Sequence, residues 1–231
     1  MKAIIFDFGG TLDTNGVHWS EFFWDVYQKF NAGISREEYE RAYVKGENDM
    51  GKVEGSFRDI LKKQLINQFR HLDSRLRGND NRDVNDSSKL IEKMADYCYT
   101  EASNCLKKSK ELLAELKKNF KLGVVSNFYG NMEEVCKEFG IFEYFDAVVD
   151  STVVGVRKPY PKIFEITLKE LNTEPKDTLV IGDSYENDIG PAKEVGCKTI
   201  WLRGRSWHEP EDISKADYVI SSLEEIKKIV N

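Results

Sequence analysis

Residues 2–13 read KAIIFDFGGTLD. The compact apolar run of residues 2–6, soon followed by two glycines, predicts a short buried strand that ends at a turn. Asp7 comes directly after this strand, and Thr11 follows the glycines. Glycine lets the backbone approach an anion closely, and a threonine hydroxyl can donate a hydrogen bond to an oxyanion. By itself the stretch fits an anion-binding loop and equally an ordinary turn in which Asp7 acts as a cap.

Short apolar runs like the first one recur along the rest of the chain. They lie at residues 122–125, 147–149, 179–181, 199–202 and 218–220. Helical periodicity fills most of the intervening sequence, at residues 109–118, 131–139, 161–171, 187–195 and 223–230. Strands that alternate with helices predict a parallel sheet with helices on both faces, which is a Rossmann-like α/β fold. Because ligands bind beyond the carboxyl ends of the strands in such sheets, the residues just after each strand are the candidate site residues.

Residues 15–105 differ from the rest of the chain because they show helical periodicity and no convincing strand. Candidate helices lie at residues 19–30 and 57–69, and a capping-box pattern at residues 35–38 predicts the start of another. Residues 86–88 are expected to cap a long fourth helix. The aromatic residues at the start of this region either line a substrate pocket or form the core of the helices; they are Trp19, Phe22, Phe23 and Trp24.

These two kinds of sequence predict two domains. The α/β core is expected at residues 1–14 and 106–231, and an inserted α-helical cap domain at residues 15–105. Within the helical domain, residues 71–88 are polar, with interleaved Arg and Asp and few apolar anchors. This composition predicts a flexible, solvated insertion, and its mixed charge gives no basic patch for RNA.

The composition restricts the possible partners. The chain has 231 residues with 34 Lys plus Arg and 40 Asp plus Glu, so its net charge is −6. This acidity gives no support for binding nucleic acid and disfavours anionic membrane surfaces. No apolar stretch has the length of a secretory signal or a membrane span. The four cysteines form no CxxC pair, so we expect reduced thiols in a cytoplasmic protein; the sequence does not determine the oligomeric state.

Two later segments of the chain carry groups that can bind an anion. Ser126 and the amide of Asn127 come after the run at 122–125 and can donate hydrogen bonds to a phosphate, although the pattern also fits a hydrogen-bonded turn. Lys158 precedes a proline, which biases its backbone toward an extended form that can aim an ammonium at an anion. The alternative is a solvated surface lysine.

Two carboxylates, Asp183 and Asp188, follow the run at 179–181 and open a helix. Hard oxygen ligands at this position suit Mg²⁺, which takes few protein carboxylates and keeps several waters. The alternative is helix capping by Asp183 or Ser184. We favour the metal site because two acids and Gly182 share one turn.

Taken together, an Asp after the first strand, then a Ser, a Lys and an acidic pair resemble the motifs of the haloacid dehalogenase superfamily. The match covers the predicted core, and the inserted helices resemble the helical cap of this family. The resemblance implies that Asp7 is the nucleophile that becomes an aspartyl-phosphate, and that Lys158 steadies the charge shared by Asp7 and the phosphate. It also implies a set of residues that hold the transferring phosphoryl group, namely Thr11, Ser126, Asn127 and Lys158.

The same resemblance implies a Mg²⁺ site. Asp7 and Asp183 would ligate the ion, Gly9 would contribute its backbone carbonyl, and Asp188 would support the site through Lys158 or water. The expected reaction is Mg²⁺-dependent hydrolysis of a phosphate monoester on a small phosphorylated metabolite.

The sequence departs from the family at Gly9. Phosphatases of the family usually carry a second Asp at this position, which protonates the leaving group and then activates water. Glycine cannot transfer a proton, and general acid–base catalysis is worth typically about 10²–10⁴-fold. We therefore expect weak activity, or restriction to good leaving groups such as acyl or aryl phosphates. Asp13 and His18 are the nearest titratable residues, but we expect a turn residue and a surface histidine there.

Three alternative functions stay open at this point. A catalytically impaired member of the family would bind a phosphorylated ligand or a protein partner. A 2-haloacid dehalogenase would also lack the second Asp, but dehalogenases work without Mg²⁺, which fits the acidic pair poorly. A phosphonate hydrolase would need a Schiff-base lysine from the cap, and the sequence does not single one out.

Overall fold

The computed structural model describes residues 1–72, 84–207 and 209–230. The chain divides into two compact units, one made of Met1–Trp19 with Ser103–Asn231 and the other of Ser20–Ala102. These bounds differ by a few residues from the predicted domain bounds. That the two units act as a catalytic core and a cap stays a prediction. One helix, α4 (Val84–Leu116), contributes residues to both units.

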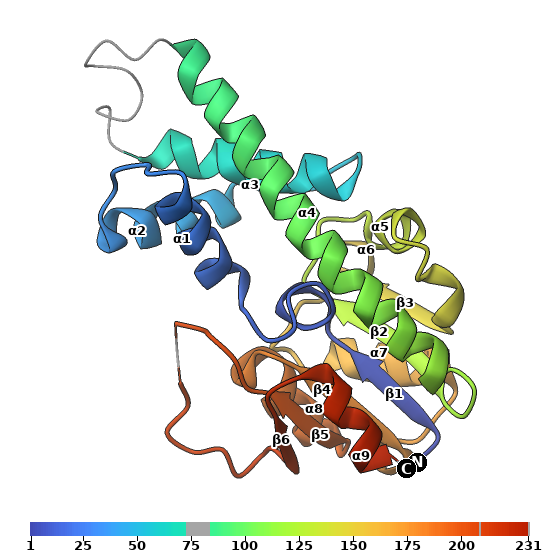
Figure 1. The fold of residues 1–231 in the computed structure, drawn as a ribbon. Coiled ribbons are helices and arrows are strands. Elements are labelled where there is room, and N and C mark those ends of the chain that lie inside the picture. Colours follow the sequence, from blue (N-terminus) through green and yellow to red (C-terminus); the bar gives the residue numbers. More distant parts are fainter. Residues whose placement is uncertain (73–83, 208, 231) are drawn as a thin grey trace. The chain divides into compact units, whose positions relative to one another are not determined.

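The first unit contains a six-stranded sheet in which every pair of neighbours is parallel (Figure 1). The strand order is β3-β2-β1-β4-β5-β6. The Rossmann-like α/β fold predicted from the sequence is therefore confirmed. The strands are β1 (Ala3–Phe6), β2 (Lys121–Ser126), β3 (Ala147–Asp150), β4 (Thr178–Gly182), β5 (Lys198–Leu202) and β6 (Tyr218–Ile220).

The strands next to β1 are in register at their carboxyl ends. Phe6 pairs with Val124 of β2 on one side and with Ile181 of β4 on the other. The residues that follow these three strands are consequently brought to one edge of the sheet. This register turns three segments that are distant in sequence into one cluster of loops.

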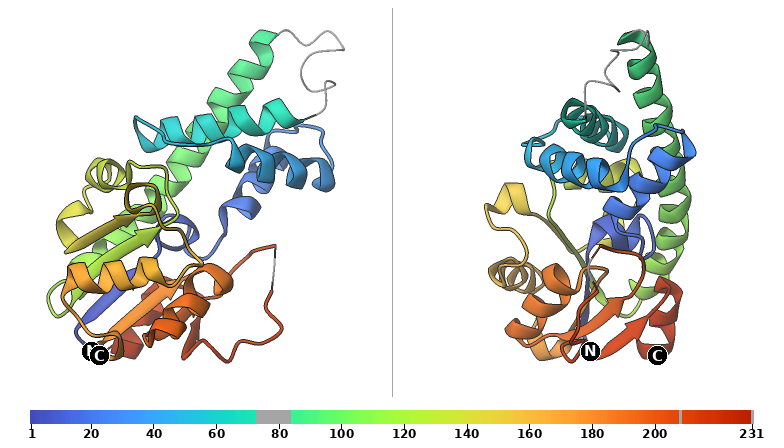
Figure 2. Two further views of the ribbon diagram at one scale, coloured as in Figure 1. Left: turned by 180° about the vertical axis from the view of Figure 1, so that it is seen from behind. Right: turned by 90° about the vertical axis from the view of Figure 1, so that its left-hand side faces the viewer.

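Both faces of the sheet are covered by helices of the same unit (Figures 1 and 2). Helix α7 (Lys162–Leu171) and α8 (Gly190–Val195) lie on one face, and α9 (Lys227–Val230) with the last part of α4 lies on the other. Two further helices are α5 (Met132–Glu138) and α6 (Ser151–Val154), and short helical turns lie at Phe8–Leu12, Phe142–Tyr144, Pro175–Asp177, Tyr185–Ile189 and Leu223–Ile226.

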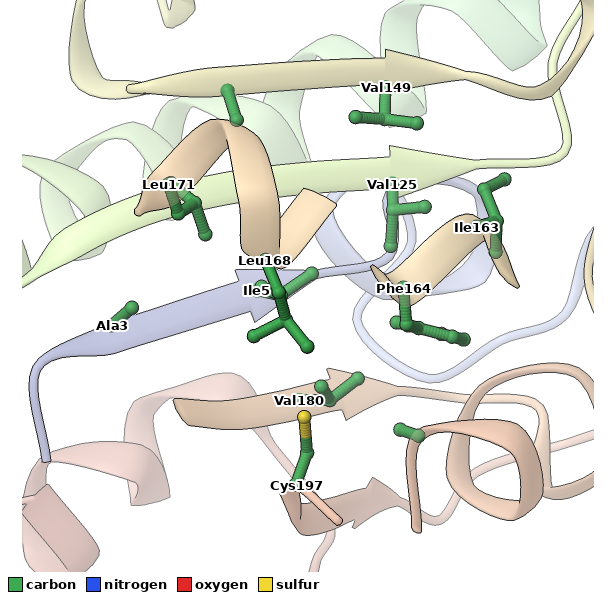
Figure 3. Close-up of a cluster of buried hydrophobic side chains, with 12 residues drawn as sticks. Ala3, Ile5, Val125, Val149, Ile163, Phe164, Leu168, Leu171, Val180 and Cys197 are labelled. Carbon is green, nitrogen blue, oxygen red and sulfur yellow. The ribbon is translucent and has the colours of Figure 1, made fainter. Parts of the chain in front are cut away.

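The core between α7 and the sheet is a layer of aliphatic and aromatic side chains (Figure 3). Phe164 and Leu168 of α7 lie over Ile5, Val125 and Val180, which come from three adjacent strands. All five are at most 5% exposed. Full burial of such a side chain contributes about 1.5–3 kcal/mol, so this layer holds the strands in the order that builds the loop cluster.

The second unit is helical. It consists of α1 (Trp19–Lys29), α2 (Arg36–Asn48), α3 (Phe57–His71) and the first part of α4. The predicted capping box is confirmed: the Ser35 hydroxyl accepts a hydrogen bond from the Glu38 amide at 3.2 Å, and Glu38 Oε2 accepts one from the Ser35 amide at 2.8 Å. Phe23 is fully buried and packs against Tyr43, so this member of the early aromatic group belongs to the core.

Two sequence predictions about the long helix are wrong. Residues 109–118 do not form a separate helix, because no Gly or Pro interrupts the chain between residues 84 and 116 and α4 is continuous there. The helix also begins at Val84 rather than at the expected cap at residues 86–88.

The predicted polar insertion at residues 71–88 is likewise too long. Its first two residues belong to α3 and its cap, Leu72 is 2% exposed, and its last residues are helical. Residues 73–83 lie outside the described part of the chain. Among the helices that the structure describes, none combines the length and the apolar character needed to cross a bilayer.

Candidate active site

The buried acid Asp7 lies where the carboxyl ends of three strands meet. Its amide donates a hydrogen bond to the Ile181 carbonyl of β4 at 2.9 Å, which fixes the direction in which the chain leaves β1. Ser126 ends β2 and Asp183 follows β4. All three side chains are buried, so the sheet edge holds polar groups that water does not solvate.

Lys158 lies between two carboxylates. Its Nζ atom is 2.5 Å from Asp7 Oδ1 and 2.6 Å from Asp188 Oδ1, and the Lys158 residue is only 6% exposed. Burial lowers the pKa of Lys158, but the carboxylates of Asp188 and Asp7 more than offset this and hold the pKa above its usual value. Lys158 is therefore a buried ammonium that remains charged, and the alternative of a solvated surface lysine is wrong.

Thr11 connects the loops that follow β1 and β4. Its Oγ1 atom is 3.2 Å from Asp7 Oδ2 and 3.1 Å from Asp183 Oδ1, and it accepts a hydrogen bond from the Asp183 amide at 3.0 Å. A hydroxyl carries one proton, so Thr11 donates to one carboxylate at a time. This leaves the other carboxylate oxygen available for another partner.

Two glycines make room for the acidic side chains. A Cβ atom on Gly10, whose φ is +92°, would lie 2.3 Å from Asp183 Oδ2. A Cβ atom on Gly182 would lie 2.3 Å from Asp188 Oδ2. Both distances are far inside van der Waals contact, so any side chain at these positions would displace a carboxylate.

The acidic pair does not serve mainly as a helix cap. The Ser184 hydroxyl accepts a hydrogen bond from the Asn187 amide at 3.2 Å and so caps the following turn. Asp188 Oδ2 accepts one from the Ser184 amide at 3.0 Å while its other oxygen holds Lys158. Asp183 Oδ2 is buried and has no hydrogen-bond partner within the described residues. A buried, unpartnered carboxylate oxygen is costly unless a cation binds it.

The charge balance of the cluster fits a divalent cation. Carboxylate oxygens from Asp7, Asp183 and Asp188 lie within 4.8 Å of one another. Within the described part of the chain, Lys158 is the one residue that forms a salt bridge with this group, and it does so with Asp7 and Asp188. Burial, reinforced by Asp7 and Asp188, raises the pKa of Asp183 well above its usual range. Burial also raises the pKa of Asp188 to about 6, although Lys158 opposes the shift. Hard oxygen donors in this number suit Mg²⁺.

Trp19 lies beside Gly9 and is hydrogen-bonded to Asp13. Gly9 has ordinary backbone angles, φ −76° and ψ 119°, and a Cβ atom there would lie 3.5 Å from Cδ1 of Trp19. The Trp19 indole donates a hydrogen bond to Asp13 Oδ2 at 2.8 Å, and the Gly10 amide donates one to Asp13 Oδ1 at 2.8 Å. Burial raises the pKa of Asp13 to about 7. Asp13 thus holds the turn and the indole in place, which is the turn role expected for it.

Two contacts around the site had no signal in the sequence. The Trp201 indole donates a hydrogen bond to the Asp183 carbonyl at 2.9 Å. The Asn127 side chain is turned toward the Lys158 main chain, where Oδ1 accepts from the Lys158 amide at 2.8 Å and Nδ2 donates to the Lys158 carbonyl at 3.0 Å. The Ser126 hydroxyl makes no hydrogen bond within the described residues, so it is available to a ligand.

Comparisons with known proteins agree with this geometry. A family model for haloacid dehalogenase-like hydrolases matches residues 1–196. The chain is 32% identical over 143 residues to pyrimidine 5'-nucleotidase YjjG of Escherichia coli K12, which covers 61% of each chain. It is 33% identical over 125 residues to glyceraldehyde 3-phosphate phosphatase of Pyrococcus furiosus, which covers 52% of each. The chain thus spans between half and two thirds of the length of these curated relatives.

A solved structure gives the same result for the fold. The HAD phosphatase from Thermococcus onnurineus superposes with a TM-score of 0.54 at 25% identity, and the match covers 100% of this chain and 98% of that one. The family model covers well over half of the chain, and the residues that carry the family motifs converge at one edge of the sheet. The chain belongs to the haloacid dehalogenase-like hydrolases.

Proposed function

We propose that this protein is a Mg²⁺-dependent phosphatase that hydrolyses a small phosphorylated substrate through an aspartyl-phosphate at Asp7. The observation that carries the proposal is the contact of Lys158 with both Asp7 and Asp188 beside the unpartnered Asp183 oxygen. A structural domain has no need for three buried carboxylates around one ammonium, because such an arrangement is costly to bury.

In the proposed reaction, the Asp7 carboxylate attacks the phosphorus atom and the bond to the leaving group breaks, with the electron pair going to the leaving oxygen. A carboxylate that approaches a phosphate dianion meets like-charge repulsion, and Lys158 offsets part of it. Thr11, Ser126 and the amide of Asn127 donate hydrogen bonds to the phosphoryl oxygens. Water then cleaves the acyl-phosphate bond, which releases phosphate and restores Asp7.

The metal site would be formed by Asp7, Asp183 and the Gly9 carbonyl, with Asp188 in support. Mg²⁺ bound there supplies positive charge that neutralises phosphoryl oxygens. Lys158 and Thr11 keep Asp7 in a single orientation before the substrate arrives, because each binds a different oxygen of its carboxylate. This preorganisation lowers the reorganisation needed during phosphoryl transfer.

The surroundings of Gly9 favour leaving groups that need no proton. The Trp19 indole lies beside Gly9, and both oxygens of Asp13 already accept hydrogen bonds. Acyl and aryl phosphates release a carboxylate or an aryloxide, which is a weakly basic anion, so these leaving groups need little general-acid help. The relatives are named for phosphatase activity on glyceraldehyde 3-phosphate and nucleotidase activity on pyrimidine 5'-nucleotides, which supports a small phosphorylated substrate.

Gly9 also supports a second candidate function, in which the protein binds a phosphorylated ligand or a protein partner without turnover. Such a protein would keep the anion-binding residues but would not need the acid. Binding of inorganic phosphate without hydrolysis of any substrate in the panel below would favour it.

The test is hydrolysis of acetyl phosphate, p-nitrophenyl phosphate and glycerol 3-phosphate, each with Mg²⁺ and with EDTA. We expect Mg²⁺-dependent turnover, with acetyl phosphate hydrolysed about 10²–10⁴-fold faster than the alkyl ester because the acid is absent. Turnover that is unchanged by EDTA, or equal rates on the acyl and alkyl phosphates, would contradict the proposal.

A further inference from the structure

The main chain at Lys158 is held by a side chain from another loop. The carboxamide of Asn127 forms a two-point contact with it, through Oδ1 to the amide nitrogen at 2.8 Å and through Nδ2 to the carbonyl oxygen at 3.0 Å. Asn127 directly follows Ser126 at the end of β2, and Lys158 lies 31 positions later in the chain. The carbonyl and the amino group of the Asn127 side chain are therefore both hydrogen-bonded to Lys158.

We propose that Asn127 is a positioning residue that aims the Lys158 ammonium at Asp7 by fixing the main chain from which Lys158 extends. The inference rests on the proposed function, in which Lys158 balances the charge on Asp7. The phosphate-binding role implied for Asn127 by resemblance then belongs to its main-chain N–H, since its side chain is engaged with Lys158.

A lysine needs such support in this site. Its side chain is long and has many rotamers, and a small shift at its base changes where the ammonium lies. Lys158 Nζ must lie within hydrogen-bond distance of Asp7 and Asp188 at once. When the main chain is fixed at both its N–H and its C=O, the ammonium has fewer accessible positions outside hydrogen-bond distance of the two carboxylates.

Other contacts hold the segment after β2 to the end of β3 and to α6, so removal of the Asn127 carboxamide should not release this segment. The Thr152 hydroxyl donates to the Phe128 carbonyl at 2.6 Å. Asp150 Oδ2 accepts hydrogen bonds from the amides of Gly130 at 2.8 Å and Met132 at 3.2 Å. The effect of changing Asn127 is therefore expected to be local to Lys158.

The test compares Asn127→Ala and Asn127→Asp with Thr152→Val, a matched control that removes a hydrogen bond between the segment after β2 and α6 without touching Lys158. Two quantities are measured for each: steady-state kinetics on acetyl phosphate, and the rate at which an acetylating reagent modifies Lys158, mapped by mass spectrometry. Melting temperatures are recorded to show that the variants fold.

We expect Asn127→Ala to lower kcat by about 10²-fold with a smaller change in KM, because a misaimed group mainly weakens the transition state. Lys158 should become modifiable in Asn127→Ala and stay protected in Thr152→Val. Asn127→Asp should give no rescue, since its carboxylate can accept from the Lys158 amide but would repel the Lys158 carbonyl.

Three results would overturn the inference: Asn127→Ala with wild-type kcat and a protected Lys158, a loss of kcat that merely follows a lower melting temperature while Lys158 stays protected, or full rescue by Asn127→Asp. The modification rate needs no turnover. An inactive wild type would therefore count against the proposed function, while exposure or protection of Lys158 would still decide the role of Asn127.

Discussion

Asp7→Asn is expected to abolish turnover, with kcat on acetyl phosphate lowered by about 10⁴–10⁶-fold, as is typical when a covalent nucleophile is removed. A carboxamide is a poor nucleophile, so no aspartyl-phosphate can form. The shape of the side chain is unchanged, and Thr11 Oγ1, which is 3.2 Å from Asp7 Oδ2, can still donate a hydrogen bond to an amide oxygen. We therefore expect Asp7→Asn to fold normally and to lack phosphatase turnover.

The measurement is steady-state hydrolysis together with acid quenching after a brief exposure to ³²P-labelled substrate. The wild type should retain label that hydroxylamine releases, and Asp7→Asn should retain none. Asp146→Asn is the matched control, because Asp146 lies away from the site and binds Lys117 and the Leu122 amide. Activity of Asp7→Asn within tenfold of the wild type would show that Asp7 is not the nucleophile.

Gly9→Asp is expected to raise the hydrolysis of glycerol 3-phosphate by about 10²–10⁴-fold, which is the usual value of a positioned general acid. The backbone angles at Gly9, φ −76° and ψ 119°, are ordinary for any L-residue. A Cβ atom would meet Trp19 Cδ1 at 3.5 Å, which is normal van der Waals contact. The backbone angles and the space around the Cβ position therefore allow a side chain at residue 9.

Acetyl phosphate gives an internal comparison for Gly9→Asp. Its rate should change much less than that of the alkyl ester, because its leaving group needs little protonation. Gly9→Asn controls for the volume of the new side chain, since an amide cannot transfer the proton. If Gly9→Asn matched Gly9→Asp, or if neither changed the ratio of the two substrates, the absent acid would not be what limits this enzyme.

The sheet could be predicted from the sequence because each strand is a short apolar run with a clear end. The six predicted runs agree with β1 to β6 within two residues at each end. Helix α4 was harder, because its apolar periodicity passes from one compact unit to the other without a Gly or Pro. Local patterns mark turns and caps, but they do not show which neighbour a continuous helix packs against.

The same distinction applies to the site. Four site residues carry a local signal. Asp7 and Asp183 come after apolar runs, Thr11 follows two glycines and Lys158 precedes a proline, and the structure brings the four together. Contacts made by side chains to a distant main chain carry no such signal. Asn127 looks like a turn residue until its partner 31 residues away is known, and the position of Trp19 beside Gly9 is equally invisible in the sequence.

The acidic side chains fit together only because two of the neighbouring residues are glycines, which have a hydrogen atom in place of a side chain. A methyl group at Gly182 or Gly10 would lie 2.3 Å from an oxygen of Asp188 or Asp183, respectively. A side chain at either glycine would therefore move a carboxylate, whereas a change from Asp to Asn keeps the volume of the acidic side chain. In a survey of other chains, an acidic pair preceded by alanine in place of Gly182 would mark a site of different internal geometry, however well the remaining motifs agree.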